Sequence, residues 1–172
     1  MSNHEQYNSV EDIQKSIKKY LVDSMRSIRS NLELYAPLRQ SIKDSGYDLQ
    51  LDMIKDQVDT LITTHSISRE LSELYINAIL KIHFKNDSYT VLSVNIFSEY
   101  KKICIKVLPE VSNFDIDNLK SFEQISIIDS KFDKEVIIPI GIKRLILNDS
   151  DIPLINTRFN EDVEMIHYNY WD

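Results

Sequence analysis

The chain has 172 residues, of which 42% are hydrophobic and 27% charged, and its formal net charge is −7. These proportions are typical of a folded globular protein and exclude a disordered chain. Only two glycines occur, Gly46 and Gly141. Because the common phosphate-binding loops need several glycines at fixed spacing, the sequence excludes nucleotide-binding proteins that rely on them.

One cysteine, Cys104, is present, so no disulfide can form within the chain. A lone cysteine is typical of a reducing compartment, and we expect a cytoplasmic location. Residues 1–12 lack the basic segment and apolar run of a secretory signal, and no run of about 18 apolar residues occurs in the sequence. We therefore expect no membrane span.

Acidic residues are concentrated in the last third of the chain. Residues 109–172 carry thirteen Asp and Glu against six Lys and Arg, whereas residues 1–46 carry six against seven. This balance argues against nucleic-acid binding by the C-terminal part. It favours good solubility or, less simply, a basic partner.

The first predicted element is a long amphipathic helix that begins near residue 10, after a flexible tail over residues 1–8. Ser9 can cap it, because its hydroxyl can accept from a free backbone N–H. We expect the helix to end at Pro37, which lacks an N–H. Apolar residues recur along it at spacings of three and four, which gives one apolar stripe. The stripe comprises Val10, Ile13, Ile17, Leu21, Met25, Ile28, Leu32 and Tyr35.

A row of basic residues runs beside this stripe at helical spacing. It comprises Lys15, Lys18, Lys19, Arg26 and Arg29. One interpretation is a surface for nucleic acid, an anionic membrane or an acidic protein. We favour the simpler interpretation, the solvated face of an amphipathic helix, because acidic residues are interspersed along it.

Two shorter helices are expected next, over about Leu49–Thr64 and from Ser66 or Ser68 to about Asn77. Aspartates recur along one face of the first of these two helices. They are Asp48, Asp52, Asp56 and Asp59. We expect this row to face the basic residues of the long helix across an antiparallel pair. A row along a helix spreads its carboxylates along the axis, so it does not predict a calcium site.

The apolar spacing changes from helical to strand-like between Ile76 and Val107. Alternating apolar and polar residues there predict a meander of three strands that end near Phe84, Ile96 and Val107. One apolar face of the meander carries Leu80, Ile82, Phe84, Leu92, Val94, Ile96, Ile103, Ile105 and Val107. Further strands are expected after the meander. They cover Glu123–Ile128, Lys134–Leu147 and Asp162–Trp171.

The predicted fold is α+β, with one domain over residues 9–172. A helical half over residues 9–77, with two to three helices, packs on a mostly antiparallel sheet in a β-rich half over residues 78–172.

The sequence holds no motif that names a metal or a cofactor. Its four histidines lie at positions 4, 65, 83 and 167, and no two have a spacing that would bring them together on one helix. Paired cysteine and histidine motifs are also absent from the sequence. We therefore expect no cofactor and no metal site.

Two patterns come nearest to catalytic chemistry. Cys104 is expected on the strand face that carries Lys102 and Lys106, which would lower the pKa of its thiol. No glycine-lined oxyanion turn accompanies it, so we expect a structural cysteine.

Asp87 with Glu99 and Lys101 has the residue types of some metal-dependent nuclease sites. Our strand register places Glu99 and Lys101 in an exposed turn and Asp87 at the far end of the intervening strand, which argues against such a site.

The aromatic C-terminus has two open interpretations, a contact surface for a partner or a last strand that closes the core. Taken together, the sequence predicts a non-catalytic protein that binds another macromolecule, as an inhibitor, an immunity or anti-defence protein, or a dedicated chaperone. The alternatives are a nucleic-acid-associated protein that uses the basic row and, third, a metal-dependent nuclease. The candidate partner-binding residues are Met25, Ile28, Leu32, Tyr35, Tyr168, Tyr170 and Trp171.

We also expect a homodimer through the first helix. Its stripe is longer than the second helix can cover, which should leave apolar surface near Met25–Tyr35.

Overall fold

The computed structural model describes residues 9–156 and 162–169. The predicted tail over residues 1–8 lies outside these ranges. The chain divides into two compact units, Met1–Ala36 and Pro37–Asp172, which we describe separately. Residues 10–36, which the sequence analysis includes in one domain with the rest, thus belong to a unit of their own.

The long first helix, α1, spans Val10–Ser45 and has Pro37 inside it, so the predicted end at Pro37 is wrong. A proline removes one hydrogen bond of the helix ladder, but it does not stop the helix when the residues on both sides favour it. The division between the two units falls at this proline. At the start of α1, the Asp12 N–H donates to Ser9 Oγ at 3.2 Å, as predicted for a cap. After its end comes Gly46 with a φ of 57°, a conformation that favours glycine.

Two further helices follow, α2 over Leu51–His65 and α3 over Arg69–His83. Helix α3 corrects the prediction that the chain becomes a strand over Ile76–Phe84. Leu80 and Phe84 are buried because they lie one helical turn apart, while Ile82 between them is 73% exposed. The alternation that suggested a strand is therefore one buried helical face interrupted by a solvent-exposed residue.

The sheet begins with β1 (Tyr89–Asn95) and β2 (Lys102–Val107), which pair antiparallel. Ile103, Ile105 and Val107 are buried on one face of β2, as predicted. In β1 the register shifts between Val91 and Ser93, so Leu92 is the extra residue of a bulge. Leu92 was predicted to share an apolar face with Val94, but Val94 is buried and the bulge leaves Leu92 exposed.

The remaining strands form a parallel ladder, which corrects the predicted mostly antiparallel sheet. β3 (Gln124–Ile128) pairs with β2, β5 (Arg144–Asn148) with β3, and β7 (Glu164–Tyr168) with β5, all in parallel. The intervening connections have 15 or 16 residues, long enough to carry the chain back to the same end of the sheet. The result is a β-solenoid of about three turns. The coarser prediction, an α+β protein with its helices first, is confirmed.

Two short strands, β4 (Val136–Ile137) and β6 (Leu154–Ile155), pair in parallel on a second side of the solenoid. They replace part of the single strand predicted over Lys134–Leu147. Gly141 has a φ of 98°, and this turn separates β4 from β5.

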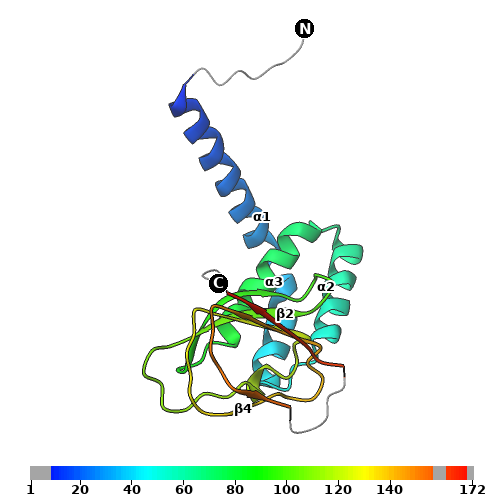
Figure 1. Cartoon of the computed structure of the whole chain (residues 1–172). Coiled ribbons are helices and arrows are strands. Elements are labelled where there is room, and N and C mark those ends of the chain that lie inside the picture. Colours follow the sequence, from blue (N-terminus) through cyan, green and yellow to red (C-terminus); the bar gives the residue numbers. More distant parts are fainter. Residues whose placement is uncertain (1–8, 157–161, 170–172) are drawn as a thin grey trace. The chain divides into compact units, whose positions relative to one another are not determined.

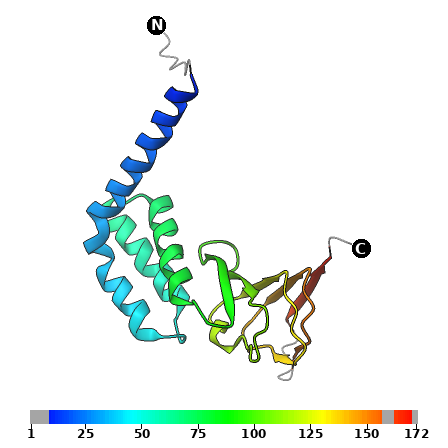
Figure 2. The same ribbon diagram turned by 90° about the vertical axis from the view of Figure 1, so that its left-hand side faces the viewer.

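Successive turns of the solenoid repeat the same side-chain environment. Ile125 pairs in register with Leu145, and Ile127 with Leu147, and all four are buried. At the next corner Asp129 and Asp149 both have positive φ, of 44° and 46°. Within the larger unit, α2 and α3 lie at the β1 end of this stack and β7 lies at the other (Figure 1, Figure 2).

Candidate interaction surfaces

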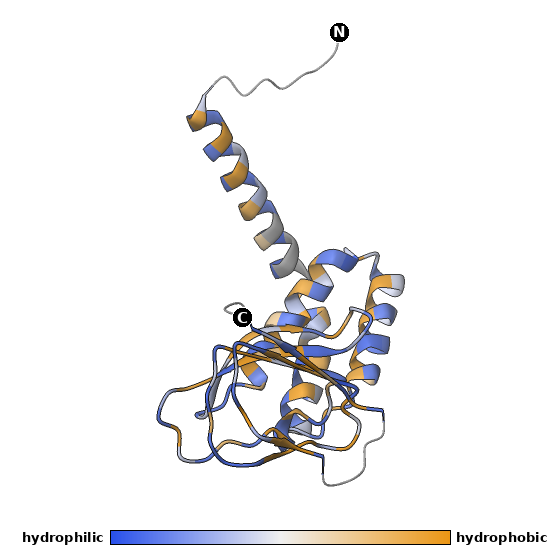
Figure 3. Cartoon of the chain, in the orientation of Figure 1, coloured by the Kyte–Doolittle hydropathy of each residue, from blue (hydrophilic) through white to orange (hydrophobic). Residues whose placement is uncertain are grey.

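The N-terminal part of α1 exposes a row of apolar side chains. Its members are between 44% and 71% exposed. They are Val10, Ile13, Ile17, Tyr20, Leu21 and Met25. In Figure 3, orange hydrophobic segments alternate with blue hydrophilic ones along the N-terminal part of α1. We call these six residues the α1 seam, and an apolar surface of this length favours contact with another macromolecule.

The seam differs in position from the apolar surface that the sequence predicts near Met25–Tyr35. Met25 is exposed, but Leu32 is half-buried and Tyr35 is only 2% exposed. The side chain of Ile28 lies outside the described part of the structure. The burial of Tyr35 gives a partner no access to it in this conformation, so the available surface runs toward the N-terminus.

The predicted basic row is accessible. Lys15, Lys18, Lys19, Arg26 and Arg29 are all exposed. Three of the aspartates that the sequence analysis expects to face this row pair within the larger unit. Asp48 pairs with Lys120 at 2.8 Å, and Asp52 and Asp59 also pair with residues of that unit.

The C-terminal aromatic group is described only in part. Tyr168 ends β7 and is 51% exposed. Tyr170 and Trp171 lie outside the described residues. β7 pairs only with β5 within the sheet that the structure describes, and Met165, in register with the buried Leu145, is 41% exposed. The last strand thus exposes an apolar side chain at a register position that is buried on the neighbouring strand.

A charged network joins α2 to the solenoid. Lys101 Nζ lies 3.0 Å from an Asp52 carboxylate oxygen and 3.8 Å from Glu123, and Lys143 lies 2.8 Å from Glu123. Only 13% of the Lys101 side chain is exposed. The sequence analysis placed Lys101 in an exposed turn, and the structure corrects this.

The Glu123 carboxylate is held in its charged form by this network. Partial burial acts to raise the pKa of Glu123. The hydrogen bond from Lys143, the backbone N–H of Lys101 and the charges of both lysines outweigh the burial, and the pKa is lowered. The network therefore indicates a structural role for Lys101 and Glu123.

The nuclease-like pattern is not assembled. Asp87 precedes β1 and Glu99 follows it, so they lie at opposite ends of that strand, and both are exposed. Among the described residues, no group of three His, Cys, Asp or Glu side chains is placed to hold a metal ion. Burial raises the pKa of Cys104, contrary to the lowering expected from nearby lysines, and so makes its thiol a poorer nucleophile at neutral pH.

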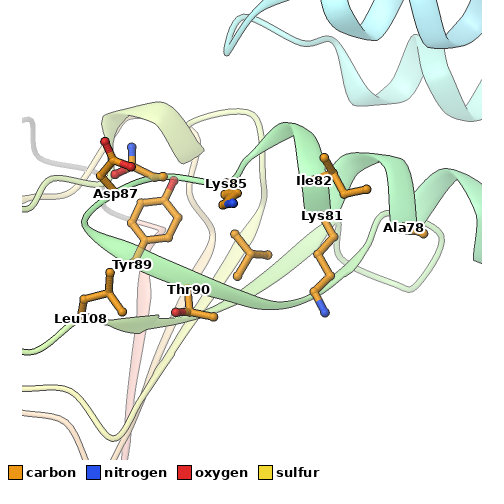
Figure 4. Close-up of a pocket in the computed structure, with 10 residues that line it drawn as sticks. Ala78, Lys81, Ile82, Lys85, Asp87, Tyr89, Thr90 and Leu108 are labelled. Carbon is orange, nitrogen blue, oxygen red and sulfur yellow. The ribbon is translucent and has the colours of Figure 1, made fainter.

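A hollow of about 620 Å³ lies between the last turns of α3 and the start of β1 (Figure 4). Ile82 and Leu108 contribute exposed apolar surface to it, and Lys81 and Lys85 contribute charge. Sequence reasoning missed it because it placed this segment of α3 in a strand. Tyr89 also lines it, but burial and the charges of Tyr47 and Asp115 raise its pKa, and its hydroxyl donates to the Phe84 carbonyl at 3.3 Å. The lining offers contacts rather than a reacting group.

Comparison with protein-family models, curated proteins and solved structures finds no match to this chain. None of the helices in the described ranges is both long and apolar enough to cross a lipid bilayer.

Proposed function

We propose that this protein is a non-catalytic cytoplasmic interaction protein that binds another macromolecule through the α1 seam. The observation that supports this most directly is the exposure of six apolar side chains along one face of a helix. Isolated helices are marginally stable in water, and most helices gain their stability by packing an apolar face. A protein partner that covers the seam would supply this packing.

The described candidates for catalysis give no support to an enzyme. The Asp87 and Glu99 carboxylates lie at opposite ends of β1, and the Cys104 thiol has a raised pKa. Lys101, the remaining residue of the nuclease-like pattern, is engaged by Asp52 and Glu123. Binding is the function for which the geometry offers a surface.

An affinity capture from the native host tests this proposal. The bait is the full chain, either wild type or with Ile17→Asp and Leu21→Asp together. Lys19→Asp serves as the matched control, because it places the same charge on an exposed position of α1 outside the seam. We expect the wild type and the control to retain the same protein and the seam variant to lose it. Equal retention by all three would contradict the proposal.

A further inference from the structure

We propose that the occupant of the α1 seam is the α1 seam of a second copy of this chain, in parallel orientation. This inference rests on the proposed function and names the partner of the same surface. Its basis is the arrangement of charge on the two sides of the seam.

The two sides of the seam carry opposite charge. Each residue turns about 100° around a helix axis, so Lys18 and Arg29 lie about 100° and 120° from Ile17 on one side. Asp12 and Asp23 lie about 140° and 120° from Ile17 on the other side. All four charged side chains are exposed. One flank of the seam is therefore mainly basic and the other is acidic.

This asymmetry favours a parallel pair. When two copies of a helix pack in parallel about a two-fold axis, the left flank of each faces the right flank of the other. Lys18 of one copy then approaches Asp23 of the second, and the reciprocal contact forms by symmetry. An antiparallel pair would place the acidic flanks together and the basic flanks together, which repel.

Two residues depart from the pattern. Lys19 lies about 160° from Ile17 on the acidic side of the seam. Glu11 lies on the basic flank at the N-terminal end of α1, where an antiparallel pair could bring it to Arg29 of the second copy. The contact of six apolar side chains supplies the affinity in either arrangement, and the charges select the orientation. An experiment must therefore report orientation as well as association.

Disulfide trapping reports both the association of two copies and their orientation. Val10 and Leu21 lie near the centre of the seam, about 20° and 40° from Ile17, and are about 17 Å apart along the axis at 1.5 Å per residue. Each is changed separately to cysteine in a full-length chain that also carries Cys104→Ser, and circular dichroism verifies the fold. In a parallel pair, Val10→Cys crosslinks to itself and Leu21→Cys crosslinks to itself, because a disulfide requires Cα atoms about 4.4 to 6.8 Å apart.

A mixture of the two cysteine proteins, distinguished by a mass tag on one of them, tests the other orientation. We expect no mixed disulfide beyond the amount formed by Lys19→Cys, which lies outside the seam. A mixed disulfide without the two self-crosslinks would overturn the parallel arrangement. If no variant crosslinks above that control at micromolar concentration, self-pairing is wrong. The affinity capture, which does not depend on self-pairing, then decides separately whether the seam binds a different protein.

Discussion

Ser130 links two turns of the solenoid through a single hydroxyl group. Its side chain is almost fully buried at 2% exposure, and its Oγ accepts from the Val107 N–H at 2.9 Å and donates to the Ile128 carbonyl at 2.7 Å. This contact lies just beyond the point where the regular pairing of β2 with β3 ends, at Ile105 and Ile127. The hydroxyl therefore continues the ladder beyond the last backbone pair.

Ser130→Ala should lower the free energy of unfolding by about 1 to 3 kcal/mol, because it leaves a buried N–H without its acceptor. Urea denaturation followed by circular dichroism measures the change. Ser112→Ala, at an exposed position, is the control and should change stability by less than about 0.5 kcal/mol. If the two variants are equally stable, the hydroxyl does not contribute as the geometry implies.

Glu123 gives the larger unit an acid-sensitive contact. Its pKa is lowered in the folded protein from the ordinary value of 4.5. The stabilisation by its lysines is therefore fully present above about pH 4.5 and is lost as the pH falls through the lowered pKa. Glu123→Gln should reduce the loss of stability with acid in this window and have its largest effect near neutral pH. Stability curves with the same slope below pH 4.5 for both proteins would contradict this.

At the scale of single elements, the sequence predicts helices better than strand order. The cap at Ser9 and the strand face of Ile103 and Ile105 are confirmed, because both depend on residues close in sequence. Pro37 inside α1 and the bulge at Leu92 were missed, because neither is required by local propensity. Whether a helix continues through a proline, or a strand takes up an extra residue, depends on the structure around it.

The parallel ladder had a signal in the sequence that a search for repeats would find. The segment from Ile125 to Phe132 reads I-S-I-I-D-S-K-F, and the segment from Leu145 to Ile152 reads L-I-L-N-D-S-D-I. Their offset of 20 residues equals the register of β3 on β5. Repeats at a period of 20 to 50 residues indicate stacked architectures. The candidate surface was less predictable, since periodicity places the apolar stripe on α1 without showing which part of it is covered.

Lys101 tests the connection between α2 and the solenoid. Lys101→Ala should lower the free energy of unfolding by about 1 to 2 kcal/mol, because the Lys101 side chain is largely covered and contacts both Asp52 and Glu123. This value lies between the effect of breaking an exposed ion pair and that of breaking a buried one. Glu99→Ala, at an exposed site only two residues away, should cost less than about 0.5 kcal/mol. Thermal unfolding of both variants in parallel measures the difference. Equal midpoints would mean that the network contributes nothing to stability.

At the scale of the whole molecule, the balance of charge argues against nucleic acid as the partner. The net charge is −7, and the five exposed residues of the basic row would release few counterions from a phosphate backbone. We expect no mobility shift of DNA or RNA with the purified protein at physiological ionic strength. A shift that disappears on replacing Lys18, Lys19 and Arg26 by alanine would instead identify the basic row as the functional surface.

The molecule as a whole comprises a solenoid unit with its own core and a helix that carries an exposed apolar seam. Among the side chains that the structure describes in α1 residues 10–25, none is buried. A substitution in the seam should therefore change association and leave the fold intact.

The most direct test is sedimentation velocity of the full chain from about 1 to 100 μM, a range suited to a dissociation constant in the micromolar region. We predict that the wild type and Lys19→Asp sediment as dimers at the upper end of this range. Ile17→Asp should sediment as a monomer with an unchanged circular-dichroism spectrum. A wild type that remains monomeric at every concentration, or an Ile17→Asp variant that dimerises as well as the wild type, would contradict the assignment of the α1 seam as a self-association surface.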